Sequence, residues 1–203
     1  MFNTKTATVN NTEFNSAYMP VGINENVILK EVSVEVSPTG RDFLRVTFED
    51  SEGKTAEFTE WKNEKNMWIK TDEDLQQRDN QQFGRILQVL KCYIENIPDA
   101  ELNSFKDMIN WVKTQLVPFI ATKKKLRLKV VYDNKGYTRV SNLGIFVESM
   151  EISSDASQIR LFKRDLLERP VVADDESKAS DPLASVTTES TPVSSSPADD
   201  LPF

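Results

Sequence analysis

The segment 123–139, KKKLRLKVVYDNKGYTR, contains seven bases and one acid, whereas the rest of the chain carries an excess of acids. In an extended strand, alternate side chains point to opposite faces, so residues 125–130 should present a basic row opposite an apolar row. Ammonium and guanidinium groups in such a row can follow the phosphates of a single nucleic-acid strand. The bases are Lys123, Lys124, Lys125, Arg127, Lys129, Lys135 and Arg139.

Aromatic rings are candidates for stacking on nucleobases, because every base presents a π-face. The predicted binding residues besides the seven bases are Phe43, Arg45, Trp61, Trp68 and Tyr137. Each ring also has an ordinary structural alternative, since aromatic side chains commonly cover the edge or the open end of a core. The basic row has one too, because Lys is common on solvated strand faces and protects sheet edges against aggregation.

The residue types that most enzymes use are scarce in this chain. It has no histidine and one cysteine, Cys92, so it lacks the imidazole and paired thiolates that nucleophiles and transition-metal sites usually require. Its six glycines never approach the spacing of a phosphate-cradling loop. We therefore expect no catalysis, no cofactor and no metal, and we expect Cys92 to be a packing residue.

One enzymatic alternative remains, a magnesium-dependent nuclease or related enzyme built on carboxylates. The densest candidates are Asp72, Glu73 and Asp74, with Glu57 and Glu60 nearby. Acids are also favoured at the start of a helix, which is the simpler interpretation of the first three.

Charge is distributed unevenly along the chain. Residues 171–203 carry seven acids and one base, a net charge of −6; removing them from the totals of 32 acids and 25 bases leaves 25 acids and 24 bases, a net of −1. The stretch TTESTPVSSSPADD in this segment is rich in Ser, Thr and Pro, a composition that cannot bury enough apolar surface to offset the entropy lost on ordering. We predict that 171–203 is a disordered acidic tail.

Alternation of apolar and polar residues predicts three antiparallel strands, at 24–37, 43–50 and 55–62, joined by the turns SPTGRD and SEGK. The segment 123–152 returns to strands, and DNKG closes a hairpin within it.

Apolar residues at helical spacing predict a helix over 83–97 between these two groups of strands. A second helix is expected after Pro98, with Asp99 as its N-cap and Pro118 near its end. The protein should therefore be mainly β with inserted helices, an α+β class.

Three strands, a helical insertion and a closing hairpin are typical of a five-stranded Greek-key barrel of the oligonucleotide-binding (OB) type. We expect this OB-like domain over 23–152, with its helical insertion at about 80–120, after an N-terminal arm at 1–22. A mixed α+β sandwich with helices on one face is the alternative. The connecting segment 153–170 contains SQIRLFKRDLLERP, which fits a docked helix, an extension of a nucleic-acid path or part of a linker equally well.

The N-terminus, MFNTKTATVNN, is polar and lacks the order of basic and apolar residues found in a signal peptide. No apolar run approaches the roughly 20 residues needed to cross a bilayer. The sequence therefore predicts a soluble cytoplasmic protein.

The chain ends in ADDLPF, directly behind the predicted disordered tail. This ending resembles the acidic tip of bacterial and phage single-stranded DNA-binding proteins, which commonly end in several aspartates followed by an apolar residue, Pro and Phe. The tip residues that match this pattern position by position are Asp199, Asp200, Leu201, Pro202 and Phe203. Residues 18–152, with the stretches MPVGINENVILKEV, VTFED and FTEWK, are also similar to phage-encoded members of this family.

The chemistry of the tip suits docking to another protein. A terminal Phe provides a large apolar ring, Pro limits the conformational entropy lost on binding, and two aspartates can meet a basic rim. The resemblance implies that the partners are replication, recombination or repair proteins and that, for a phage protein, the compartment is the host bacterial cytoplasm. A solubilising tail that happens to end in Phe is the alternative.

Together these features predict a single-stranded DNA-binding protein that coats exposed strands and recruits partners through its tip. We also expect the acidic tail to compete with DNA for the basic residues at low salt. A protein-interaction module with a docking tail is the main alternative, and it would show no binding to oligonucleotides. The sequence leaves the oligomeric state and the choice between DNA and RNA open.

Overall fold

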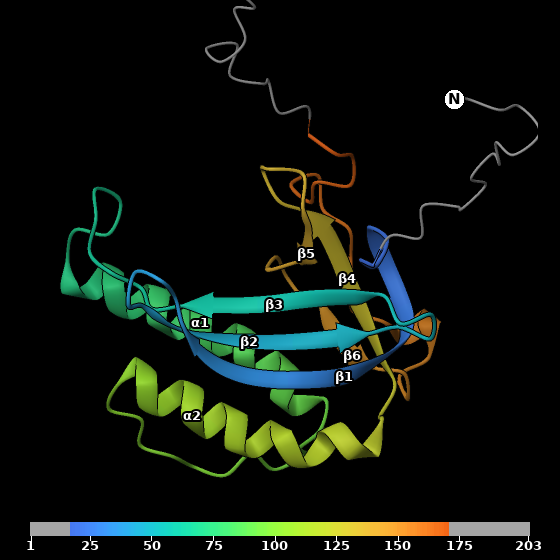
Figure 1. Ribbon diagram of the computed structural model, residues 1–203, viewed down its shortest axis with the longest axis horizontal. Helices are drawn as coiled ribbons and strands as arrows, with labels where there is room; N and C mark the ends of the chain where they lie inside the picture. The colour runs from blue at the N-terminus through green and yellow to red at the C-terminus, as the bar shows by residue number, and fades with distance from the viewer. Residues whose placement is uncertain (1–16, 171–203) are drawn as a thin grey trace, which may run out of the picture. The chain divides into compact units, whose positions relative to one another are not determined.

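The computed structural model describes residues 17–170, which form a mixed α+β protein (Figure 1). The chain divides into two compact units, 1–171 and 172–203, and all the described residues belong to the first. Most of the N-terminal arm, the acidic tail and the tip residues 199–203 lie outside the described residues. Within 17–170, no helix has the length and apolar character needed to span a bilayer.

Three strands form an antiparallel meander, as the alternation in the sequence predicts. They are β1 (Gly22–Val36), β2 (Asp42–Glu49) and β3 (Thr55–Trp61), and each begins and ends within two residues of the predicted positions. The residues at 44, 46 and 48 of β2 are apolar and buried, while their neighbours at 45, 47 and 49 lie on the outer face. The meander therefore has one face toward the core and one face toward solvent.

Three shorter strands follow the helices: β4 (Leu126–Tyr132), β5 (Thr138–Val140) and β6 (Val147–Ser149). The predicted DNKG hairpin joins β4 to β5, and its Gly136, at φ 79°, donates its N–H to the carbonyl oxygen of Asp133 at 3.1 Å. The strand order is β3-β2-β1-β4-β5, and β6 pairs with β4 beside β5. β3 and β5, the two ends of this order, also approach each other.

The long strand β1 connects the two groups of strands. Its first part, from Gly22 to Val27, pairs with β4, and its second part, from Ile28 onward, pairs with β2. The register with β4 shifts between Asn24 and Val27, where Asn26 adopts a left-handed φ of 59°. This irregularity lets one strand take part in two differently oriented ladders.

The first helix, α1 (Asp72–Lys91), is longer at its N-terminal end than the predicted helix over 83–97 and ends six residues earlier. It begins with a capping box: the hydroxyl of Thr71 accepts the N–H of Asp74 at 3.0 Å, and the Asp74 carboxylate accepts the N–H of Thr71 at 3.2 Å. This reciprocal cap satisfies two backbone donors, so it stabilises a first half of the helix that contains few apolar residues.

The second helix, α2 (Phe105–Leu116), begins at Ser104, whose hydroxyl accepts the N–H of Asp107 at 3.0 Å. The prediction of Asp99 as N-cap is therefore wrong, because Ser104 and Asp107 provide the better capping pair five residues later. The 3-10 helix η1 (Val117–Thr122) follows directly, with Pro118 in its first turn, where a missing N–H costs nothing.

The core lies between the inner face of the sheet and the two helices. Figure 1 shows α1 and α2 on one side of the meander, away from its outer face. Ile86 and Leu90 of α1 and Ile109 of α2 are completely or almost completely buried. Phe58 of β3 stacks on Phe146 with ring centroids 5.3 Å apart, which joins the meander to the segment before β6. The outer face of the meander remains uncovered by either helix.

Candidate nucleic-acid interface

The basic row predicted along β4 is not exposed. Lys129 has 0% and Arg127 4% of its surface accessible to solvent, so the expectation that both residues offer free charges to phosphates is wrong. β4 lies inside the sheet, paired with β1 on one side and with β5 and β6 on the other. The face that the alternation assigned to solvent is covered by the segment 157–170, which we call the strap.

Lys129 is the centre of the contact between β4 and the strap. Its ammonium group donates to the carboxylate of Asp165 at 3.0 Å and to the carbonyl oxygens of Leu143 at 2.8 Å and Arg160 at 3.0 Å. The ring of Phe162 lies 4.7 Å from the same nitrogen. All three ammonium protons have an acceptor, so this lysine stabilises the fold and has no donor left for a ligand.

Asp165 is held as a carboxylate by the groups around it. It accepts hydrogen bonds from the hydroxyl of Ser141 at 3.0 Å and from the N–H of Phe162 at 2.7 Å, in addition to the bond from Lys129. Burial acts to raise the pKa of Asp165, but these hydrogen bonds outweigh it and keep the pKa below its ordinary value. The strap is therefore fixed by a buried ion pair whose charges are both satisfied.

Arg127 is neutralised in a similar way. Its guanidinium bonds to Glu148, its neighbour across the β4–β6 ladder, and to Glu25 of β1 at 3.0 Å. It also donates to the hydroxyl of Ser154 at 3.1 Å. Burial acts to raise the pKa of Glu148, but hydrogen bonds from Ser157 and Arg127 lower it further than burial raises it. The sequence left three roles open for 157–170; the strap docks on β4 without forming a regular helix.

The aromatic candidates Phe43 and Trp61 meet on the outer face of the meander. They are directly paired across the β2–β3 ladder, and their rings stack with centroids 4.2 Å apart and planes 22° apart. Trp61 remains 39% exposed, while Phe43 is buried beneath its neighbours. The guanidinium of Arg45 lies 5.4 Å from the Phe43 ring, and that of Arg41 lies 5.8 Å from the Trp61 ring.

We call Arg41, Phe43, Arg45 and Trp61 the aromatic platform. Three carboxylates border it: Arg45 lies 3.4 Å from Glu35 and 3.5 Å from Glu57, and Arg41 lies 3.7 Å from Glu64. Glu35 and Glu57 hold Arg45 over the Phe43 ring, and the three acids offset the charge of both arginines. The platform therefore offers a stacking surface more than a positive field, and attraction for a polyanion must come from cations elsewhere on the protein.

The remaining sequence candidates lie at separate places. Lys123 and Lys125 are exposed just before β4, and Lys124 pairs with Glu151 at 3.1 Å. The candidates of the β4–β5 turn, which are Lys135, Tyr137 and Arg139, are exposed at the other end of that strand. A strand of seven residues is about 20 Å long, so the two groups of cations cannot contact the same nucleotide.

Trp68 lies in the loop between β3 and α1 and is 79% exposed, without a stacking partner among the described residues. The predicted site residues are thus divided among the platform, the β4–β5 turn, the N-terminal end of β4 and this loop. Figure 1 shows that the two ends of β4 lie far apart in the molecule.

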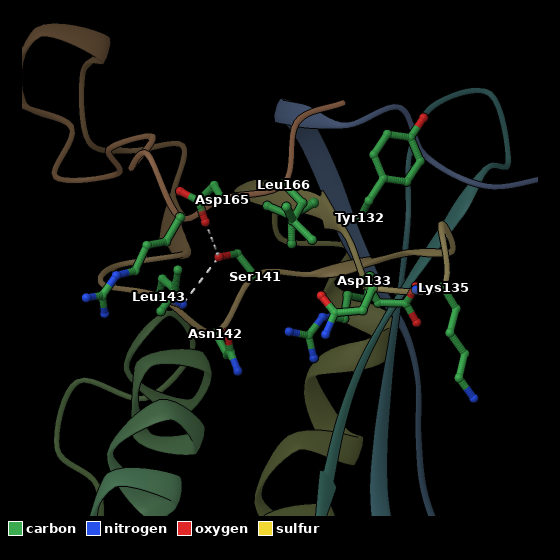
Figure 2. A pocket seen from close by; sticks show the side chains of 12 residues that line it. Tyr132, Asp133, Lys135, Ser141, Asn142, Leu143, Asp165 and Leu166 are labelled. Carbon is green, nitrogen blue, oxygen red and sulfur yellow. Dashed lines mark hydrogen bonds between the residues drawn. The ribbon is translucent and has the colours of Figure 1, made fainter. Parts of the chain in front are cut away.

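A cavity of about 410 Å³ lies beside the β4–β5 turn, between that turn and the strap (Figure 2). Its lining includes two predicted residues, Lys135 and Arg139, and one that the sequence did not single out, Arg164. Arg41 of the platform was also missed. Arg41 follows a turn and Arg164 lies in an irregular segment, and in such places no periodicity indicates which way a side chain points. Their basic character was therefore the only sign in the sequence that they could bind a nucleic acid.

The carboxylates of the nuclease hypothesis do not converge. Asp74 caps α1, Asp72 bonds to Lys65 at 2.7 Å, and Glu60 is buried against Arg85 and Gln82. Across residues 17–170 there is no group of three or more His, Cys, Asp or Glu side chains placed to hold a metal ion. Burial raises the pKa of Cys92 to about 12, so its thiol stays protonated at neutral pH, in keeping with the packing role expected for it.

No protein-family model matches this chain, and no curated protein matches it either.

Proposed function

We propose that this protein binds single-stranded DNA and protects exposed strands during replication, recombination or repair. The observation that carries the proposal is the stack of Phe43 on Trp61, flanked by the guanidinium groups of Arg41 and Arg45, on an outer sheet face that no helix covers. A partly exposed indole that is fixed in orientation by a ring beneath it is a stacking surface suited to any nucleobase.

The arrangement of strands supports the same function. An OB-like barrel has a long first strand shared between two ladders, a helix between its third and fourth strands, and its third and fifth strands brought close by curvature. Here β1 pairs with both β2 and β4, the helices lie between β3 and β4, and β3 approaches β5. We infer an OB-like barrel that is enlarged by a second helix and by β6. In that fold the outer face of the second and third strands, which carries the platform, is a common site for oligonucleotides.

We further propose that the tip residues Asp199 to Phe203 recruit replication or recombination proteins, on the chemistry of the sequence alone. A protein-interaction module remains the competing function, because a partly exposed Trp–Arg cluster is also typical of protein interfaces. The two functions differ in their response to salt: phosphate contacts make affinity fall steeply with salt, whereas an apolar protein contact changes little.

The test is a titration of fluorescein-labelled, pyrimidine-rich single-stranded DNA with the full-length protein, followed by anisotropy at 50 and 200 mM salt. We expect saturable binding that weakens at the higher salt, and much weaker binding to the matching duplex. Absence of binding to the single strand at 50 mM salt would refute the proposal and favour the protein-interaction function.

Two variants locate the contact on the protein. Replacing Trp61→Ala should weaken binding by about 1–3 kcal/mol, roughly 5- to 150-fold, because it removes the exposed ring of the stack. Trp68→Ala is the matched control, since it removes an indole that has no stacking partner in the described part of the chain. A larger loss for Trp68→Ala than for Trp61→Ala would move the base contact from the platform to the β3–α1 loop.

A further inference from the structure

The cavity beside the β4–β5 turn is built from one hairpin, formed by the turn and β5, and from the strap, which lies further along the sequence. The turn itself contributes Lys135, β5 contributes Arg139, and the strap contributes Arg164. Figure 2 shows the turn residues Asp133 and Lys135 on one side of the cavity and Ser141 and Asp165 on the other. The buried Lys129–Asp165 ion pair and the hydrogen bond from the N–H of Tyr132 to the carbonyl oxygen of Leu166, at 2.8 Å, hold the strap against β4 beside this cavity.

The three basic side chains of this cavity are unused by the fold. Lys135, Arg139 and Arg164 are exposed, and none of them forms an ion pair with another residue in the 17–170 range. This separates them from Arg127 and Lys129, whose donors are consumed by carboxylates. Two amides, those of Asn134 and Asn142, add neutral donors to the same lining.

The acids of the cavity leave it with a net positive charge. Asp165 is neutralised by Lys129, and it also accepts a hydrogen bond from the hydroxyl of Ser141. Asp133 accepts the N–H groups of Lys135 at 2.8 Å and of Tyr137 at 2.9 Å through one carboxylate oxygen, so it shapes the turn. Three free cations against this one unneutralised acid give the cavity a net charge of about +2.

We propose that this cavity binds a phosphate group, held by the guanidinium groups of Arg139 and Arg164, while Lys135, whose side chain points away from Ser141 and Asp165 in Figure 2, adds positive charge at the rim. Guanidinium presents paired donors that match the oxygens of a phosphate, and ammonium adds a point charge. A volume of about 410 Å³ exceeds that of phosphate alone and lies within the range of small-molecule sites, so it has room for the attached sugar. The proposal rests on the proposed function, in which the phosphate belongs to a bound single strand.

The experiment uses the full-length double variant Arg139→Gln/Arg164→Gln and repeats the anisotropy titration over a series of salt concentrations. Each phosphate that the protein neutralises in a single strand adds about 0.7 to the slope of log affinity against log salt. We expect the double variant to bind at least about tenfold more weakly at 50 mM salt, with a slope less steep by about 0.7 for each phosphate that it no longer holds.

The matched control is Lys106→Gln/Lys113→Gln, which changes the net charge equally. It removes two exposed cations of α2 that form no ion pair with any residue of the described range. If both double variants lose the same affinity, the effect is general electrostatics and the phosphate site is refuted, while the proposed function stands. If only the cavity variant loses affinity and slope, the site is supported. Because all four side chains are exposed, the variants should melt close to the wild type.

A second probe tests the cavity without any oligonucleotide. Inorganic phosphate at 20 mM, compared with chloride at equal ionic strength, should raise the melting temperature of the wild type more than that of the cavity variant. Equal shifts in both proteins would refute the site even if the protein fails to bind DNA.

Strands with and without a 5′-phosphate distinguish the source of the phosphate. Equal affinities indicate an internal phosphodiester. A preference for the phosphorylated strand that the cavity variant loses indicates a terminal phosphate.

Discussion

Two groups of basic residues lie within 17 residues of sequence, yet the protein uses them in opposite ways. Arg127 and Lys129 of β4 are buried and each is paired with a carboxylate, whereas Lys135 and Arg139 at the β4–β5 turn are exposed and unpaired within the described chain. The difference lies in what covers them. Carboxylates of β6 and of the strap reach the β4 pair, while the side chains of the turn pair stay open to solvent. The same residue types therefore stabilise the fold in one place and remain available for binding in the other.

The largest expected effect on stability comes from breaking the buried Lys129–Asp165 ion pair. Asp165→Asn leaves the ammonium of Lys129 buried without its counter-charge, and removing one partner of a buried pair typically costs about 3–5 kcal/mol. We expect this loss in the free energy of unfolding, measured by urea denaturation of the full-length protein. Asp155→Asn is the matched control, because Asp155 is exposed and should change stability by less than about 0.5 kcal/mol. Similar values for the two variants would show that the Lys129–Asp165 pair does not hold the strap.

A second variant tests the strap by sterics instead of charge. Gly144 has a left-handed φ of 62°, and a Cβ added there would lie 2.6 Å from the Phe162 ring. Gly144→Ala should therefore destabilise the protein by about 1–3 kcal/mol, because the backbone is strained and the ring must move. Gly84→Ala is an informative control of opposite sign. A Cβ at Gly84 in α1 meets nothing within 4 Å, so alanine should stabilise the helix by about 1 kcal/mol.

Acid should weaken the buried Lys129–Asp165 ion pair. The pKa of Asp165 is lower in the folded protein than in the unfolded chain, so its contribution is fully present above the unfolded value of about 3.9 and is lost as the pH falls through the folded value. We expect the difference in unfolding free energy between the wild type and Asp165→Asn to be constant from pH 7 to 5 and to shrink below pH 4. A difference that stays constant down to pH 3 would contradict the lowered pKa.

The contrast between the two groups also explains what the sequence could predict. Strand positions followed from local alternation, which is why 24–37, 43–50 and 55–62 agree closely with β1, β2 and β3. Alternation correctly placed Arg127 and Lys129 on the face opposite the apolar row. It could not show that this face is covered, because the covering carboxylates lie 21 and 36 residues further along the chain.

The predicted helix boundaries were wrong, and the reason lies in the local sequence. The first half of α1, DEDLQQRDNQQ, has almost no apolar periodicity, and its start depends on the capping box of Thr71 with Asp74, whose second partner is Asp where Glu is usual. The stacking of Phe43 on Trp61 was within reach of the sequence, since both were candidates and the turn SEGK fixes the register that pairs them. Arg164 was not, because the strap has no regular structure from which its direction follows.

The smallest expected effect is on DNA affinity, and it comes from competition between the acidic tail and DNA for the exposed cations of the β4–β5 turn. Residues 171–203 have a net charge of −6, and their covalent connection to the folded unit gives them a high effective concentration near its cations. A chain ending at Pro170 should therefore bind single-stranded DNA a few-fold more tightly at 50 mM salt, and the gain should vanish by about 300 mM, where the Debye length falls well below 10 Å. The full-length variant Asp199→Asn/Asp200→Asn separates the tip from the rest of the tail. If the competition is a general charge effect, neutralising these two of the seven acids should recover only part of the gain. Full recovery would instead mean that the tip itself occupies the cations. Unchanged affinity on removal of the tail would mean that the exposed group of cations is open to DNA at all salt concentrations.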